Sequence, residues 1–152
     1  MARASDVAKY FLLLTASGEE DAGEAMTHLK LQKLVYYAQG FHLALFPGRP
    51  LFDEPIEAWL HGPVINSMWG QYGHYNFNPI PPDPAFDPDA ALNGEQKQLL
   101  NDVWNAYGQF SAWKLRDMTH QEPPWAGAYV ANRNEVISHE SLREYFATQI
   151  EP

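Results

Sequence analysis

Residues 27–46, THLKLQKLVYYAQGFHLALF, form the stretch of sequence that decides the fold. Thr27 is placed to cap a helix over about residues 28–46, and the Pro47-Gly48 pair ends it. Apolar side chains recur at helical spacing and form one stripe, which consists of Leu31, Leu34, Val35, Ala38, Phe41 and Leu45. The positions that remain for water are Lys30, Lys33 and Tyr37. A helix that is apolar around most of its girth belongs in the middle of a helical bundle.

Helical patterns also occur on both sides of this central stretch. Ser5 is placed to cap a first helix that reaches about Leu14, and residues 17–24 are typical of a solvated loop. Four shorter patterns close the chain: residues 95–107, a helix capped by Ser111, one opened by Pro123-Pro124 and one capped by Ser138. The sequence therefore predicts a mainly α protein, a compact single-domain helical bundle of about six or seven helices.

The helical period disappears after residue 49. Alternation over residues 56–60 predicts a short strand, which we expect to pair with Leu51-Phe52 in a small β-hairpin near residues 50–60. Gly62-Pro63 is then expected to start the next helix. That helix is expected to bury Val64, Ile65, Met68, Trp69 and Tyr72.

Residues 76–93, called the strap below, are too rich in proline for a helix or a central strand. The strap also carries three aspartates: Asp83, Asp87 and Asp89. A connection of this length is either a loose extended segment or a functional one, and the sequence leaves both open.

Charge and cysteine content exclude several classes of function. Ten Lys and Arg against nineteen Asp and Glu give a net charge of −9, so direct nucleic-acid binding is not expected. The same charge suits a basic protein partner. Cysteine is absent, which excludes a disulfide scaffold, a cysteine nucleophile and a thiolate metal site.

The sequence also bears on location. No stretch reaches the eighteen or more apolar residues of a membrane span, and the short apolar run near the N-terminus lacks a signal-peptide cleavage pattern. We therefore expect a soluble, cytoplasmic protein with no membrane partner.

No catalytic set is recognisable. The six histidines lack the H-E-x-x-H spacing of a metal site, and there is no nucleophile elbow or P-loop. We expect no metal, no cofactor and no enzymatic activity. The alternative from another class is a small hydrolase that uses His61, His120 and a nearby carboxylate.

Two short segments stand out: Trp59 to Val64 (WLHGPV) and Thr119 to Trp125 (THQEPPW). Each places an imidazole and an indole where one element ends and the next begins. Both segments are either rigid tertiary corners with the tryptophans as core plugs, or a preorganised surface for a protein partner.

Four segments together resemble the Panacea antitoxin domain, which includes SocA-like antitoxins and phage-associated GepA-like proteins. They are residues 29–40 (LKLQKLVYYAQG), 50–59 (PLFDEPIEAW), 61–64 (HGPV) and 119–125 (THQEPPW). Their order is the family's, and the similarity extends over about residues 5–147, so we expect one such domain over residues 1–152. The motif positions carried over are Leu31, Gln32, Lys33, Leu34, Tyr36, Trp59, His61, Gly62, Pro63, Thr119, His120 and Trp125.

The resemblance implies a non-catalytic antitoxin that neutralises a co-encoded toxin, a translation inhibitor, by direct protein–protein binding. Some members of the family instead act as adaptors that deliver their toxin to a protease complex, and this alternative stays open. The candidate toxin-interface residues are Asp83, Asp87, Asp89, His61 and His120.

Overall fold

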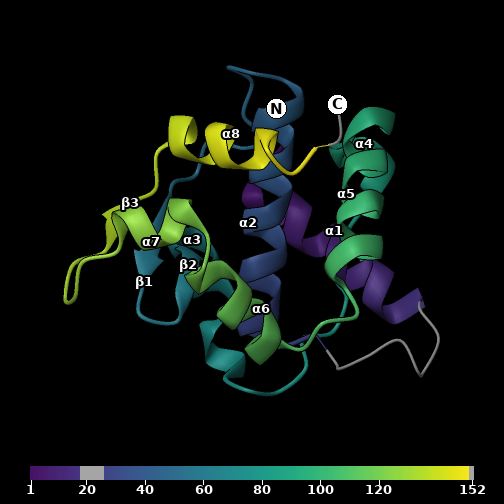
Figure 1. The fold of residues 1–152 in the computed structure, drawn as a ribbon. Coiled ribbons are helices and arrows are strands. Elements are labelled where there is room, and N and C mark those ends of the chain that lie inside the picture. The colour runs from purple at the N-terminus through teal and green to yellow at the C-terminus, as the bar shows by residue number, and fades with distance from the viewer. Residues whose placement is uncertain (18–25, 151–152) are drawn as a thin grey trace.

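The computed structural model describes residues 1–17 and 26–150, so the loop expected at residues 17–24 lies outside these ranges except for Ser17. Helix α2 (His28–Leu45) runs through the middle of the molecule (Figure 1). Four longer helices surround it: α1 (Ala4–Ser17), α5 (Gly94–Tyr107), α6 (Ala112–His120) and α8 (His139–Ala147). The described part also contains three short α-helices, α3 (Asn66–Tyr72), α4 (Pro88–Ala91) and α7 (Pro123–Ala128), and the 3-10 helix η1 (Gly73–Tyr75). The mainly α, compact single-domain architecture is confirmed.

Helix α2 is buried on all of its sides up to its last residue, Leu45, which was expected in the apolar stripe and is 48% exposed. The burial of the other sides corrects a further expectation. Lys30, Lys33 and Tyr37 were assigned to solvent, and all three are buried. Lys30 Nζ donates a hydrogen bond to the Gly108 carbonyl at 2.6 Å, and the Tyr37 ring stacks on the Tyr107 ring at 4.1 Å. The reason is that α5, α6 and α8 pack against the side of α2 that the sequence left for water.

Two glutamines of α2 hold the extended segments of the chain. The Gln32 side chain accepts a hydrogen bond from the Ile65 backbone N–H at 2.7 Å and donates one to the Ile65 carbonyl at 3.3 Å. Gln39, two turns later, accepts from the Leu51 N–H and donates to the Phe52 carbonyl, both at 2.7 Å. These bonds satisfy backbone groups that would otherwise be buried without partners.

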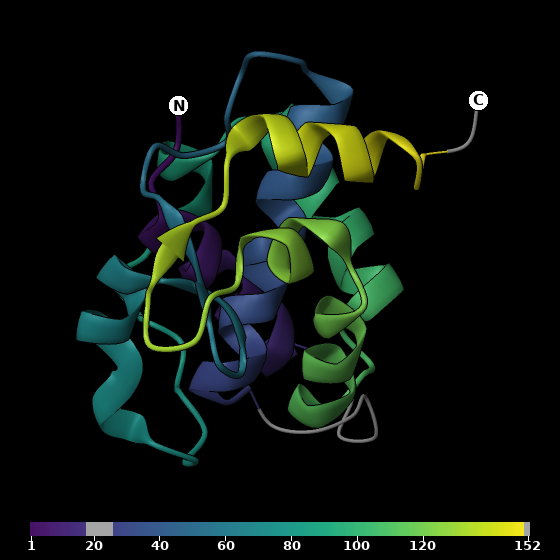
Figure 2. The same ribbon diagram turned by 60° about the vertical axis from the view of Figure 1, so that its left-hand side comes forward.

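The β-hairpin is present, but with a different partner strand. β1 (Ile56–Trp59) pairs antiparallel with β2 (Gly62–Ile65), and a short β3 (Glu135–Val136) pairs with the other edge of β1 (Figure 2). Val64 and Ile65 therefore lie in a strand, and the helix expected at Gly62-Pro63 begins only at Asn66. Proline is tolerated in β2 because β2 is an edge strand.

The ends of several elements also differ from expectation. Helix α1 begins at Ala4, so Ser5 lies inside it and Asp6 accepts the hydrogen bond from the Arg3 N–H at 3.1 Å. The strap contains the one-turn helix α4, because proline is tolerated at the first helical position. Trp69, expected in the core, is 42% exposed. The caps formed by Thr27, Ser111 and Ser138 are confirmed.

Helix α8 crosses α2 at a glycine. A Cβ atom on Gly40 would lie 2.2 Å from the Phe146 ring, so a side chain there has no room. Figures 1 and 2 both show α8 lying across the C-terminal half of α2. The glycine of the AQG sequence therefore permits this helix crossing.

Candidate functional site

The two unusual sequence segments meet in one place, which we call the corner. It consists of Lys33 of α2, residues 59–62 at the hairpin turn, residues 116–120 at the end of α6, and Trp125 of α7. The Trp125 indole N–H donates a hydrogen bond to the Trp59 carbonyl at 2.7 Å. The His120 ring stacks on the Trp125 ring at 4.0 Å with an interplanar angle of 10°. The Trp125 indole thus joins two segments that are 66 residues apart in sequence, and the His120 ring packs against that indole.

Gly62 packs directly against Lys33 and Thr119 in the corner. Its φ of +117° is a conformation that side chains other than glycine rarely adopt. A Cβ atom there would lie 2.9 Å from Lys33 Cε and 3.1 Å from Thr119 Oγ1. The Thr119 hydroxyl donates to the Arg116 carbonyl at 2.9 Å, which fixes its orientation. Three of the motif positions therefore belong to a single contact.

Lys33 brings a cation into this closed space. Its side chain is 1% exposed, and burial together with the nearby Arg116 guanidinium lowers its pKa to about 7. Within residues 1–17 and 26–150, no ion pair and no side-chain hydrogen bond reaches its ammonium group. Burial and the Lys33 charge also lower the pKa of His28 to about 4. The charge of Lys33 is therefore not neutralised by the described part of the chain.

Arg116 extends the positive charge to the surface. Its Nε donates to His61 Nδ1 at 3.3 Å, its Nη1 lies 3.3 Å from Asp117, and its guanidinium lies 4.8 Å from the centre of the Trp113 ring. Because a guanidinium only donates, His61 Nδ1 is the acceptor of that bond.

His120 lies deeper in the corner than His61. Its Nε2 is buried and has no hydrogen-bond partner among the residues described. Burial, followed by the charges of Arg116 and Lys33, lowers the pKa of His120. The structure thus places both candidate histidines beside the same guanidinium.

An exposed surface covers the outside of the corner and extends to Trp113, which lies beside Arg116 on α6. We call it the corner surface, and its side chains are Leu60, His61, Trp113 and Arg116. Leu60 is 60% exposed and Trp113 is 61% exposed. Sequence analysis did not identify Trp113 or Arg116. The available signal was spacing, since Trp113 falls outside the apolar stripe of Leu115, Met118 and Thr119 that faces the core.

A buried carboxyl group locks α7 onto α2 behind the corner. Glu122 is 7% exposed and accepts hydrogen bonds from the Tyr36 hydroxyl at 2.9 Å and the Tyr37 hydroxyl at 2.8 Å. Burial raises the pKa of Glu122 to about 7, against the opposing effect of the two bonds. Glu122 and Tyr37 were not among the candidates, although both lie inside the quoted motifs.

The remaining motif positions lie behind the corner surface. Leu31, Leu34 and Tyr36 are core residues of α2. Gln32 holds the end of β2, and Pro63 lies within β2, where it is buried. These buried residues hold α2 and β2 in place beneath the corner surface, whereas the His61 side chain is exposed to solvent.

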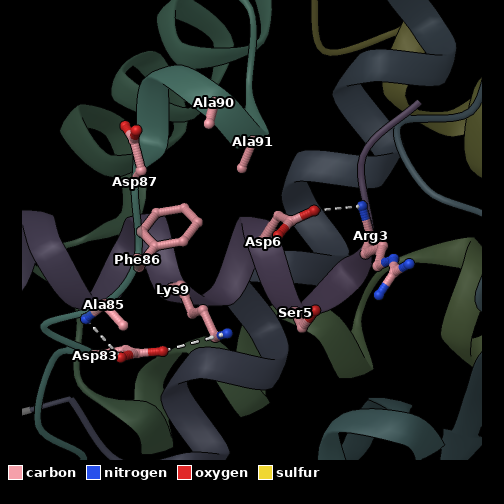
Figure 3. Close-up of a pocket in the computed structure, with 10 residues that line it drawn as sticks. All are labelled: Arg3, Ser5, Asp6, Lys9, Asp83, Ala85, Phe86, Asp87, Ala90 and Ala91. Carbon is pink, nitrogen blue, oxygen red and sulfur yellow. Dashed lines mark hydrogen bonds and ion pairs between the residues drawn. The ribbon is translucent and has the colours of Figure 1, made fainter.

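The aspartates of the strap lie elsewhere, against α1 and α5. Figure 3 shows Asp83 pointing toward Lys9, whose Nζ lies 3.4 Å away, at the edge of an open hollow of about 580 Å³. A hydrogen bond from the Ala85 N–H and the charge of Lys9 lower the pKa of Asp83. Asp87 caps α4, and Asp89 pairs with Lys97. Figure 1 shows α4 on the opposite side of the molecule from the hairpin.

The hydrolase alternative requires a carboxylate beside one of the two histidines. In the described ranges, no carboxylate forms a hydrogen bond with His61 or His120, and a guanidinium instead of a carboxylate orients His61. Searched over the same residues, no group of three histidine, cysteine or acidic side chains is placed to hold a metal ion. No described helix is both long and apolar enough to cross a membrane.

Comparison with known proteins identifies the family. The family model for the SocA-like antitoxins, defined by the Panacea domain, matches residues 31–126, which is more than half of the chain and contains every motif position named above. The chain therefore belongs to this family. Searches of curated proteins and of solved structures each gave no match. Family membership supports an antitoxin role and suggests a non-catalytic one.

Proposed function

We propose that this protein is the antitoxin of a toxin–antitoxin pair and that it neutralises a co-encoded toxin, a translation inhibitor, by direct protein–protein binding in the cytoplasm. The observation that carries the proposal is the corner surface, where the exposed Trp113 indole lies near the His61 ring and the Arg116 guanidinium and the exposed Leu60 directly precedes His61. Tryptophan and arginine are the residue types that most often dominate the binding energy of protein interfaces. Family membership supplies the antitoxin role, and this surface supplies a place for the toxin.

The support beneath the surface favours binding without rearrangement. Trp125 joins α7 to the hairpin, Gly62 packs directly on Lys33, and Gln32 holds both backbone groups of Ile65. A surface that is already ordered loses little conformational entropy when it binds. In this proposal most motif positions shape the surface, and His61 and His120 lie at or just beneath the contact.

The strap remains a second candidate face. Asp83, Asp87 and Asp89 can meet a basic region of the toxin, and their position against α1 and α5 means that a toxin touching both faces must wrap around the molecule. Neutralising the three aspartates to asparagine tests this face separately from the corner surface.

We also propose that the Panacea domain extends beyond the matched segment to cover residues 1–152. The support is that α1 and α8, which lie outside residues 31–126, both pack on α2, and that Gly40 of α2 receives Phe146 of α8. A chain ending before Ser138 should therefore lose the cooperative unfolding transition that the full chain shows.

Co-expression with the neighbouring gene tests the antitoxin role. We expect that gene to stop growth alone, and growth to return when this protein is present. Trp113→Ala should weaken rescue and lower affinity for the purified toxin about tenfold or more, because it removes the largest exposed side chain of the corner surface. The control is Leu45→Ala, a 48% exposed apolar residue at the end of α2 that lies outside both candidate faces, and this variant should rescue fully. A harmless neighbour, or two purified proteins that never associate, would refute the proposal.

The same experiment distinguishes occlusion from the adaptor alternative. If the protein acts by occlusion, toxin levels stay constant and rescue persists in a host that lacks the relevant protease. If it acts as an adaptor for a protease complex, toxin levels fall and rescue disappears in that host.

A further inference from the structure

We infer that the corner is a receptor for a carboxylate: an aspartate or glutamate side chain of the toxin binds Arg116 above Lys33, while neighbouring apolar side chains of the same toxin segment pack on Trp113 and Leu60. This inference rests on the proposed function and specifies the chemistry of its contact.

The first support is an excess of positive charge that the chain does not neutralise. Lys33 has no counter-ion within the described ranges, and the acidic side chain paired with Arg116 is its sequence neighbour Asp117, which is 62% exposed. Arg116 uses Nε on His61 and Nη1 on Asp117, and no bond from its Nη2 is found among the described residues. The N–H groups of Nη2 are therefore available to one oxygen of a carboxylate, and displacement of the exposed Asp117 from Nη1 would complete a bidentate pair.

The second support is the position of Lys33. A buried cation without a partner is costly, and an approaching anion would lower that cost. The ammonium nitrogen lies 3.4 Å from the position that a Cβ atom on Gly62 would occupy. The Lys33 ammonium group therefore lies directly against the backbone of the hairpin turn. A carboxylate held by Arg116 over that turn need not touch Lys33, because the attraction between charges is strong across a poorly solvated layer.

The third support distinguishes a protein carboxylate from a nucleic-acid phosphate. A net charge of −9 repels an extended polyanion such as a nucleic acid at long range. A basic protein is attracted at long range instead, and a single carboxylate on its surface meets the positive charge of the corner only at short range. The flanking Leu60 and Trp113 supply apolar contact area, which suits a polypeptide segment. The strap and the corner would then act together, the acidic charge attracting a basic toxin and the corner fixing its orientation.

A titration with small anions tests the corner without the toxin. The full-length, isotope-labelled protein is titrated with sodium acetate, and separately with inorganic phosphate, at constant ionic strength. We expect acetate to give saturable NMR shifts at His61, at the Gly62 amide and at the Lys33 side chain, and the Arg116→Gln variant to lose them. Shifts that persist in Arg116→Gln, or that equal those at the surface residue Lys97, mean an adventitious ion only. Saturation by phosphate but not by acetate overturns the inference.

Binding to the purified toxin tests the complete proposal. We expect Arg116→Gln to raise the Kd at least tenfold, Arg116→Lys to recover part of the affinity, and Arg133→Gln, a control at a 71% exposed arginine, to change nothing. A toxin that binds the wild type and Arg116→Gln equally refutes the carboxylate contact and leaves the antitoxin role intact. A toxin that binds neither refutes both. The circular dichroism spectrum of each variant verifies that it is folded.

Discussion

Gly62 lies so close to Lys33 that a methyl group on the glycine would stand 2.9 Å from the lysine Cε. This contact joins the hairpin turn to the central helix, and it brings the HGP and LQK motifs together. A sequence comparison can show that both motifs are present, but the contact explains why they occur together: the glycine leaves the space that the lysine side chain fills.

Gly62→Ala should destabilise the protein strongly. The substitution forces alanine into a φ of +117° and also creates the contacts with Lys33 and Thr119. Backbone strain and overpacking together should lower the free energy of unfolding by about 2–4 kcal/mol in urea denaturation. Gly70→Ala is the matched control, because Gly70 lies within α3 with nothing within 4 Å of its added Cβ. That control should be neutral or stabilising by up to about 1 kcal/mol, and equal losses in the two variants would contradict the assignment.

Gly40→Ala should also destabilise, although alanine is the better helix former. Propensity alone favours alanine by about 1 kcal/mol, whereas a Cβ atom 2.2 Å from the Phe146 ring costs more, about 1–3 kcal/mol or above. The two effects are separated by a double-mutant cycle with Phe146→Leu, measured by thermal unfolding. We expect the second substitution to reduce the penalty of the first, and additive losses would place α8 further from α2 than the structure does.

The sequence predicted the parts of this fold that local rules control. The caps at Thr27, Ser111 and Ser138 were predicted because a serine or threonine just before a helical apolar pattern can accept a hydrogen bond from a free N–H of the first turn. The central place of α2 followed from its broad apolar surface. The partner of β1 did not follow, because alternation identifies a strand without choosing its neighbour. The Leu51 N–H and the Phe52 carbonyl bind the Gln39 side chain, and the Leu51 carbonyl accepts from the Ala2 N–H, so this segment is held without pairing to β1.

The candidate site was predicted in its motifs but not in its electrostatics. His61 and His120 were identified, and the structure brings both to Arg116. Lys33 was assigned to water because helical periodicity describes one helix and not the helices packed around it. Its burial depends on α6 and the hairpin, which come from distant parts of the sequence. Trp113 could have been recognised from its spacing, which places it outside the core-facing stripe of α6, whereas Arg116 required the surface itself, since an exposed charged side chain leaves no periodic signal.

Glu122 should make stability fall as the pH rises from about 4.5 to about 7. Its pKa is raised to about 7 in the folded protein, so the folded state binds more protons than the unfolded state in this window. The contribution is full below about pH 4.5 and is lost by about pH 7, with a size of roughly 3 kcal/mol. Urea denaturation across this range should show the loss in the wild type relative to Glu122→Gln.

The comparison with Glu122→Gln is needed because His28 acts in the same window with the opposite sign. Burial lowers the pKa of His28 to about 4, so its contribution rises with pH, and the difference between the two proteins isolates the carboxyl group. Tyr37→Phe provides a further check, since it removes a bond that lowers the pKa of Glu122 and should move the loss to higher pH. Parallel stability curves for wild type and Glu122→Gln would mean that the carboxyl titrates normally.

Lys33 should make stability rise between about pH 7 and the alkaline range. Its folded pKa is lowered to about 7 from 10.5, so the unfolded state binds more protons above pH 7 and deprotonation favours folding. In Lys33→Met, which keeps an unbranched side chain one atom shorter and without the charge, this slope should vanish. The stability advantage of Lys33→Met should therefore be largest at or below pH 7 and should shrink by about 1.4 kcal/mol per pH unit up to about pH 9.5. An NMR titration of the Lys33 side chain checks the cause directly, because a midpoint near 10 would show that the ammonium is solvated and that the corner carries no unneutralised buried cation.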